Sequence, residues 1–88
     1  MTLSFPNRSR SYDAEAHRVR FWGYDRAFEV PFFVDETALF KLRPQTERIE
    51  AAILAAFDAT RERIIEVAAR MYQPRQRGTH YFLAATDF

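Results

Sequence analysis

Two histidines, His17 and His80, are the only imidazole groups in the 88-residue chain, and carboxylates lie near both of them in the sequence. Asp13 and Asp25 flank His17, and Asp87 follows His80. A metal site would need ligand spacing such as His-x-x-x-His or a carboxylate triplet with a glycine turn, and neither pattern is present. Both histidines fall in predicted strands, where half-buried structural roles are common. We therefore expect no metal site.

The residue types needed for nucleophilic catalysis or phosphate binding are also missing from the expected patterns. The chain has no cysteine, no Gly-x-Ser-x-Gly turn, and only two glycines, which are too far apart to form a phosphate-binding loop. Paired carboxylates occur at Asp35 with Glu36 and at Asp58 with Glu62, but on predicted helix surfaces, where such groups are usually solvated. We expect no catalytic residue, no cofactor and no enzymatic activity.

Arginine is the remaining source of chemistry, since it supplies all but one of the 13 basic residues. A guanidinium group binds phosphate or carboxylate in a bidentate manner, although arginine and alanine together also reflect codon usage in a GC-rich genome. The 12 acidic residues leave a net charge of +1, which does not indicate an acidic partner. The candidate interaction surface consists of charged and aromatic residues near the predicted hairpin, in the N-terminal arm and before the last strand: Arg18, Arg20, Trp22, Tyr24, Asp25, Glu29, Arg8, Arg10, Arg75 and Arg77.

The element that must position most of these residues is a β-hairpin over residues 17–34. Gly23 is the predicted corner, because glycine adopts positive φ without steric cost. A two-residue loop (Gly23–Tyr24) and a four-residue loop (Gly23–Arg26) both keep one face apolar, and both place Arg18 or Arg20 opposite Glu29. The predicted core face contains Val19, Phe21, Phe28, Val30 and Phe32.

Other predicted strands are short. Leu3 and Phe5 form an N-terminal strand, and residues 79–84 form a last strand with Tyr81 and Leu83 on one face. Pro31 lacks an N–H, so its strand is an edge or is bulged there. The order predicts an α+β fold in which a small, largely antiparallel sheet packs against one long helix. Residues 6–13 and 73–78 are expected to be the least regular.

Two helices are predicted between the hairpin and the last strand. A short helix follows the N-cap Asp35 and stops before Pro44, and a long helix runs from Thr46 to Tyr72. About 27 residues span roughly 40 Å, whereas a globule of this size is about 30 Å across. No glycine or proline interrupts the long helix, so we expect it to overhang the sheet or bend rather than break sharply. An overhang favours a homodimer, and the alternative is a frayed first turn that shortens the helix to about 22 residues.

Composition indicates one folded domain over residues 1–88. Hydrophobic residues make up 48% of the chain, which is ample for a core. No apolar run approaches the roughly 18 residues that cross a bilayer, and the N-terminus has no signal-peptide layout. With the absence of cysteine, this predicts a cytoplasmic protein without membrane contact.

The hairpin sequence resembles a known family. The runs Arg10-Ser11-Tyr12-Asp13, His17 through Asp25 and Glu29 through Val34, together with a long helix and the final Asp87-Phe88, are similar to small bacterial proteins grouped as domain of unknown function 1488. Many of these proteins have glycine where this chain has Arg26, which strains Arg26 if the position needs positive φ. The resemblance implies a compact α+β domain and no activity, cofactor or catalytic residue.

Three functions fit these observations. The favoured one is a small interaction or regulatory module that self-associates through the long helix or through the sheet edge near Pro31. The second is nucleic-acid binding by the arginines and Trp22, although a near-neutral charge lacks the expected basic footprint. The third is ligand binding or catalysis in an aromatic pocket, lined by Tyr12, Trp22, Tyr24, Phe33, Tyr81 and Phe88.

Overall fold

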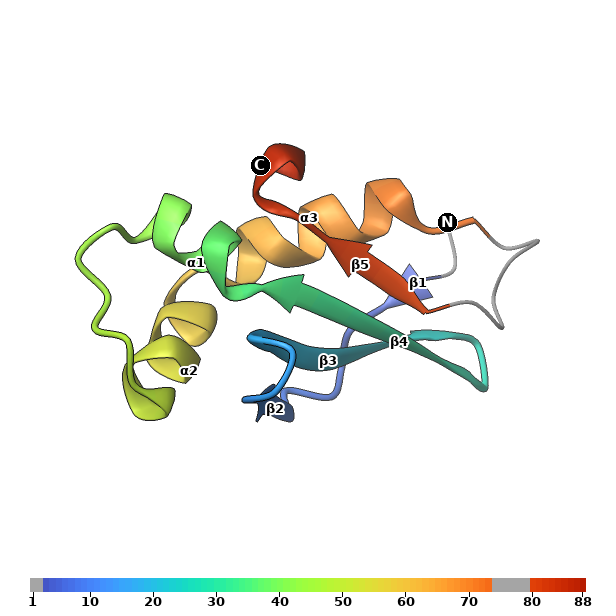
Figure 1. Cartoon of the computed structure of the whole chain (residues 1–88). Coiled ribbons are helices and arrows are strands. Elements are labelled where there is room, and N and C mark those ends of the chain that lie inside the picture. Colours follow the sequence, from blue (N-terminus) through green and yellow to red (C-terminus); the bar gives the residue numbers. More distant parts are fainter. Residues whose placement is uncertain (1–2, 74–79) are drawn as a thin grey trace.

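The computed structural model describes residues 3–73 and 80–88, and Figure 1 shows how their elements are arranged. A five-stranded sheet carries the helices on one face, with α1 and α2 gathered at the end opposite the tip of the β3–β4 hairpin. In chain order the elements are β1 (Leu3–Ser4), β2 (Arg10–Asp13), β3 (Arg18–Asp25), β4 (Phe28–Asp35), α1 (Glu36–Leu42), α2 (Glu50–Ala59), α3 (Arg61–Met71), β5 (Tyr81–Leu83) and a final 3-10 turn, η2 (Ala85–Asp87).

The sheet is open and mixed, so the predicted α+β class is confirmed. Its strand order is β1-β3-β4-β5, and β2 pairs with another stretch of β3. All pairs are antiparallel except β4 with β5. A parallel pair needs a long crossover connection, and the three helices lie within the connection between β4 and β5. β5 pairs only with residues 32–34 of β4, so among the described strands Pro31 lies where β4 is an edge.

The hairpin exists, but both predicted registers are wrong. Phe21 pairs with Phe32 and Gly23 with Val30, so the turn falls at Arg26 and Ala27 rather than at Gly23. Arg26 adopts φ 58°, the left-handed conformation that glycine accepts more readily. The predicted faces survive because the shift from either expected register is an even number of residues.

Gly23 lies inside β3 and has no positive φ. A Cβ atom at this position would lie 2.8 Å from Cε2 of Phe5 and 3.2 Å from Cδ1 of Leu3. The glycine therefore lets the N-terminal segment pack closely against the inner face of the sheet, and it does not turn the chain.

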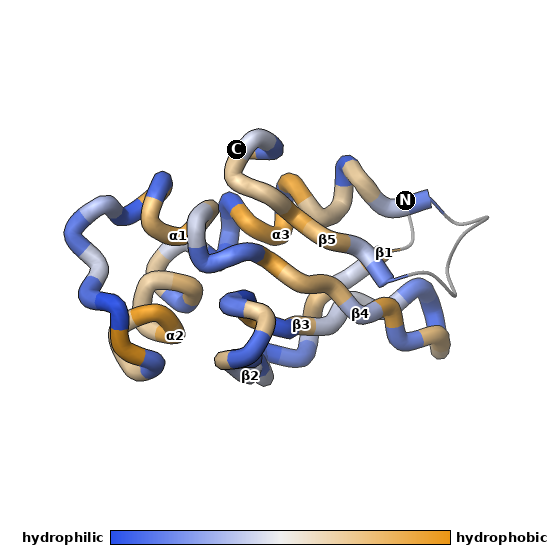
Figure 2. Tube along the Cα trace, in the orientation of Figure 1, coloured by the Kyte–Doolittle hydropathy of each residue, from blue (hydrophilic) through white to orange (hydrophobic). Residues whose placement is uncertain are grey.

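The hydrophobic core lies between the inner face of the sheet and the helices. Figure 2 shows hydrophobic stretches along β4 and β5, in contrast to the mostly hydrophilic loop that joins α1 to α2. Phe28, expected in the core, is 52% exposed near the hairpin tip, because the shifted register moves it beyond the helices. The buried cluster contains Val19, Phe21, Val30, Phe32, Val34, Ala38, Leu39, Ile53, Phe57, Ile64, Val67, Ala68, Tyr72, Tyr81 and Leu83.

The predicted long helix is wrong, because it is two helices that meet at Thr60. The backbone of Thr60 leaves the helical region (φ −113°, ψ 14°), and its Oγ1 donates a hydrogen bond to the carbonyl of Ala56 at 2.8 Å. A threonine side chain that competes for a backbone acceptor bends a helix without glycine or proline. An unbroken helix of roughly 40 Å would exceed the 36 Å long axis of the protein. The first helix also begins at Glu50, not at Thr46.

Residues 10–13, expected to be irregular, form β2 against β3. Tyr12 packs against the core, and its hydroxyl donates to Oε1 of Glu36 at 2.7 Å. The second segment expected to be irregular comprises residues 73–78, and residues 74–78 of it lie outside the described residues. The predicted N-cap Asp35 is confirmed by the start of α1 at Glu36.

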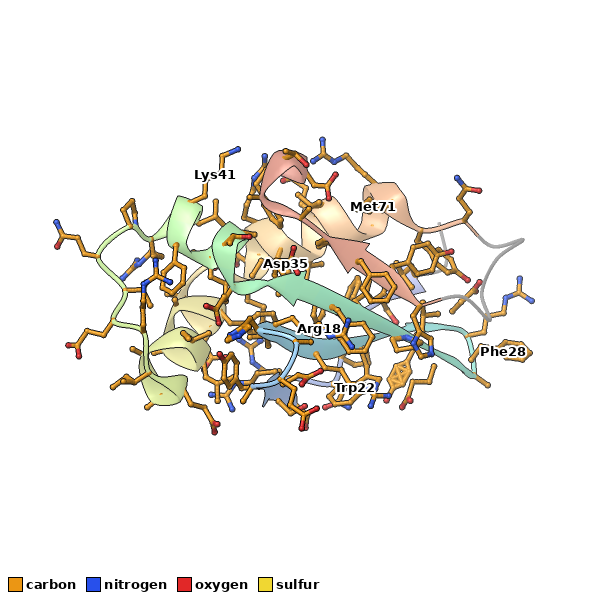
Figure 3. All side chains as sticks on the ribbon, viewed as in Figure 1. Arg18, Trp22, Phe28, Asp35, Lys41 and Met71 are labelled. Carbon is orange, nitrogen blue, oxygen red and sulfur yellow. The ribbon has the colours of Figure 1, made fainter. Side chains whose placement is uncertain are left out.

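The C-terminal residues are fixed to α1. Nζ of Lys41 donates to the carbonyl oxygens of Ala85 at 3.0 Å and Phe88 at 2.6 Å, and Figure 3 shows Lys41 beside this end of the chain. Within the described residues, no helix is both long enough and apolar enough to cross a bilayer.

Candidate functional site

The outer face of the sheet, which points away from the core and the helices, gathers arginine and aromatic side chains. We name this set the arginine–aromatic surface, and in Figure 3 its residues Arg18 and Trp22 lie on the other side of the β4 ribbon from Met71 of α3. Strand alternation explains the grouping, since even-numbered residues of β3 face outward while Val19 and Phe21 face the core. The arginine–aromatic surface consists of Arg18, Arg20, Trp22, Phe33 and Phe82.

Phe33 is the centre of the arginine–aromatic surface. Although it points outward, it is only 7% exposed, because Phe82 stacks on it with ring centroids 5.3 Å apart and planes 12° apart. The guanidinium carbon of Arg18 lies 4.0 Å from the Phe33 centroid and 5.3 Å from the Phe82 centroid. Phe82 itself is 55% exposed, so the stack presents an aromatic ring to solvent.

Arg20 extends the stack toward the hairpin tip. Its guanidinium carbon lies 5.1 Å from the Trp22 ring centroid and 5.8 Å from that of Phe33. Its Nε is buried and has no hydrogen-bond partner among the described residues. Arg20 also makes no ion pair there, whereas Nε of Arg18 is 3.2 Å from Oδ2 of Asp13. Arg20 is therefore a cation held between rings and available to a carboxylate or carbonyl of a partner.

Carboxylates surround the arginine–aromatic surface. Asp13 and Asp35 flank Arg18 in the sheet register, and Glu29 lies opposite Tyr24. The Tyr24 hydroxyl is 3.4 Å from Oε2 of Glu29, so the predicted pairing of an arginine with Glu29 is wrong. With two arginines and three carboxylates, the outer face is close to neutral. It combines an aromatic centre with a polar rim, which is the arrangement found at protein–protein interfaces.

Three other residues of the predicted surface, Asp25, Arg10 and Arg8, lie elsewhere in the structure. Asp25 is 4% exposed on the inner face, where it accepts a hydrogen bond from the hydroxyl of Tyr72 at 2.5 Å. Arg10 binds Asp58 through two hydrogen bonds of 2.9 and 2.8 Å, which raise the pKa of Arg10 above its usual value. Arg8 lies near α3, at a distance from the sheet's outer face. Arg75 and Arg77, which were also predicted to belong to this surface, lie outside the described residues.

A polar cluster around Glu36 is a second group that the sequence did not single out. Its Oε1 accepts from the Tyr12 hydroxyl at 2.7 Å and is 3.5 Å from Nδ1 of His17. The backbone N–H of Glu36 also donates to the carbonyl of His17, which has φ 55°. The hydrogen bond to Glu36 is the main cause that raises the pKa of Tyr12. Glu36 therefore fastens β2 and the β2–β3 turn to α1, which no local sequence pattern could reveal.

The two histidines lie in different surroundings, since His17 is beside Glu36 while the His80 ring is 5.9 Å from that of Phe33. Across residues 3–73 and 80–88, no three His, Asp or Glu side chains are grouped to hold a metal ion. The aromatic residues expected to line a pocket are divided between layers. Tyr81 belongs to the core, whereas Trp22 and Phe33 belong to the arginine–aromatic surface.

An open mixed sheet with helices on its inner face and arginine–aromatic stacks on its outer face defines a small α+β protein. The profile of a family of proteins of unknown function, DUF1488, matches residues 3–83, and the chain belongs to this family. Its fold is similar to the crystal structure of a DUF1488 protein of unknown function from Shewanella loihica PV-4, with a TM-score of 0.65 and 15% identity over 93% of this chain and 91% of that chain. No curated protein matched the sequence. The family resemblance is confirmed, and it indicates no activity.

Proposed function

We propose that this chain is a small, non-enzymatic interaction module that binds a protein partner through the arginine–aromatic surface. One observation carries the proposal: Phe82, 55% exposed, is stacked on Phe33 beneath the Arg18 guanidinium, on the sheet face away from the helices. Aromatic residues and arginine are enriched where interfaces gain most of their binding energy. Ring stacking also fixes these side chains in advance, which lowers the entropy lost on binding.

The charge of the outer face supports a protein partner over a nucleic acid. A nucleic acid requires an excess of cations to neutralise its phosphates. Here Arg18 and Arg20 are matched by the carboxylates of the same face, and Arg10 is engaged by Asp58. A protein surface with both charge signs and an apolar centre is the better complement.

The proposal includes the absence of catalysis and of a cofactor. Tyr12 and His17 both contact Glu36, and these contacts tie β2 and the β2–β3 turn to α1. This arrangement supports a structural role for the cluster around Glu36. We also propose a cytoplasmic location, which a cysteine-free chain is suited to.

A second copy of the chain is one candidate partner. The long-helix overhang that first favoured a homodimer is absent because the helix breaks at Thr60. The outer face offers a different argument, because Arg20 and Glu29 lie at different positions along the same hairpin. A twofold axis through the arginine–aromatic surface would bring Arg20 of one copy toward Glu29 of the other.

The test compares the natural chain with Phe82→Ser and with Ile49→Ser. Ile49 is a matched control, since it is also 55% exposed but lies at the start of α2, away from the outer face. Each tagged protein is used to capture partners from its native cell after nuclease treatment, and its mass is measured by light scattering. We expect one protein, or a second copy, to be bound by the natural chain and by Ile49→Ser and lost with Phe82→Ser.

Three results would contradict the proposal. The natural chain could retain no partner and show a mass of 10.4 kDa at high concentration. All three proteins could retain the same partner equally. A parallel capture without nuclease could retain a partner that is lost after nuclease treatment, which would indicate nucleic-acid binding instead.

A further inference from the structure

A hollow lies where α2 meets α3, on a different part of the molecule from the arginine–aromatic surface. Its volume is about 530 Å³, and it is open to solvent. The N-terminal segment forms one wall through Phe5 and Arg8, and the helix junction forms the other through residues 58–63. The side chains around it include three arginines, Arg8, Arg61 and Arg63.

Arg61 is the unusual residue of this hollow, because it is 5% exposed and makes no ion pair within the described residues. Its Nη2 donates to the carbonyl oxygens of Asn7 at 3.0 Å and Phe5 at 3.3 Å. Its Nη1 is buried and has no hydrogen-bond partner among the described residues. A buried guanidinium without a carboxylate is unfavourable unless another acceptor satisfies it.

The charges nearby do not supply that acceptor. Burial is the main cause that lowers the pKa of Arg61, the positive charge of Arg8 lowers it further, and the negative charge of Asp58 acts in the opposite direction. Asp58, one carboxylate of the lining, already accepts two hydrogen bonds from Arg10. Arg63 is paired with Glu66 on α3. Among the described residues, Arg8 and Arg61 therefore remain without a carboxylate partner, and Glu62 is the unpaired acid of the lining.

We propose that this hollow binds a small phosphate-type oxyanion between Arg61 and Arg8. An oxyanion would supply an acceptor for the unpartnered Nη1 of Arg61 and would offset the repulsion between the positive charges of Arg61 and Arg8. Arg8 is exposed and lines the same hollow, so its guanidinium is open to an anion there. Because Arg61 also holds the carbonyls of Phe5 and Asn7, the bound anion would fix the N-terminal segment against α3.

The experiment titrates the full chain with inorganic phosphate and with glycerol phosphate, against sodium chloride at matched ionic strength. Binding is followed by calorimetry and by amide chemical shifts of residues 58–63. Arg8→Gln is the test variant, because Arg8 is exposed and makes no hydrogen bond or ion pair within the described residues that would stabilise the fold. Arg70→Gln is the control, since Arg70 is an exposed arginine on the same helix and outside the hollow.

We expect saturable binding of phosphate, an affinity about tenfold weaker in Arg8→Gln, and no change in Arg70→Gln, because one charge-assisted hydrogen bond is lost. Binding of glycerol phosphate as tight as that of phosphate would assign the site to the phosphate group of a larger molecule, whereas binding of phosphate alone would assign it to the free ion. No saturable binding of either probe overturns the proposal. Equal loss in both variants also overturns it, since it would reflect net charge alone.

Discussion

Replacing Gly23 by alanine tests whether this glycine exists for packing. The added Cβ would lie 2.8 Å from Cε2 of Phe5, about 0.6 Å closer than ordinary van der Waals contact begins. The Phe5 ring has limited room to move, because it packs against the rings of Phe21 and Phe32 at 6.1 and 5.6 Å between centroids. Arg61 additionally holds the carbonyl of Phe5.

Overpacking of this kind costs about 1–3 kcal/mol, and alanine in place of glycine returns about 0.4–1 kcal/mol by restricting the unfolded chain. We therefore expect Gly23→Ala to lower the free energy of unfolding by about 1–2 kcal/mol, measured by urea denaturation. In a Phe5→Ala background, the same change should be neutral or stabilising, because the clash is gone. A Gly23→Ala variant as stable as the natural chain would refute the packing explanation.

Three further predictions concern stability. Phe28→Ala should lower the free energy of unfolding by about 1 kcal/mol, far less than the roughly 3–5 kcal/mol of a buried phenylalanine, and a larger loss in urea denaturation would place its ring in the core. Phe33→Ala should cost about 3 kcal/mol, whereas Phe82→Ala should cost about 1 kcal/mol for the lost stacking; equal losses would contradict their different burial. Glu36 raises the pKa of Tyr12 in the folded state, so the stability from this phenol is present below its unfolded pKa of about 10 and is lost as pH rises through the higher folded value. Denaturation at increasing alkaline pH should show this loss in the natural chain and a shallower one in Tyr12→Phe.

Alternation of residue types was enough to predict much of the sheet. It separated Val19 and Phe21 from Arg18 and Arg20, and this division holds although the register moved. It also put Phe82 on the face opposite Tyr81, as the structure shows. Face assignment depends only on period-two alternation, so it survives an even shift in pairing.

The features that the sequence did not predict depend on tertiary packing. The sequence predicts a corner at Gly23, but this residue lies inside β3, where the Phe5 ring from another part of the chain packs closely against it. The break at Thr60 carries no glycine or proline, and it coincides with the hydrogen bond from the Thr60 side chain to the carbonyl of Ala56. The grouping of Phe82 with Phe33 required β5 to pair with β4 across the whole helical region.

The central claim is that the arginine–aromatic surface binds a protein partner, and the dissociation constant of that complex tests it most directly. Calorimetry would compare the natural chain with Phe82→Ser and Ile49→Ser, which remove equally exposed apolar side chains from different faces. Loss of an interface hot spot should weaken binding by about thirtyfold in Phe82→Ser, and Ile49→Ser should bind like the natural chain. Unchanged binding in Phe82→Ser, or equal weakening in both variants, would contradict the claim.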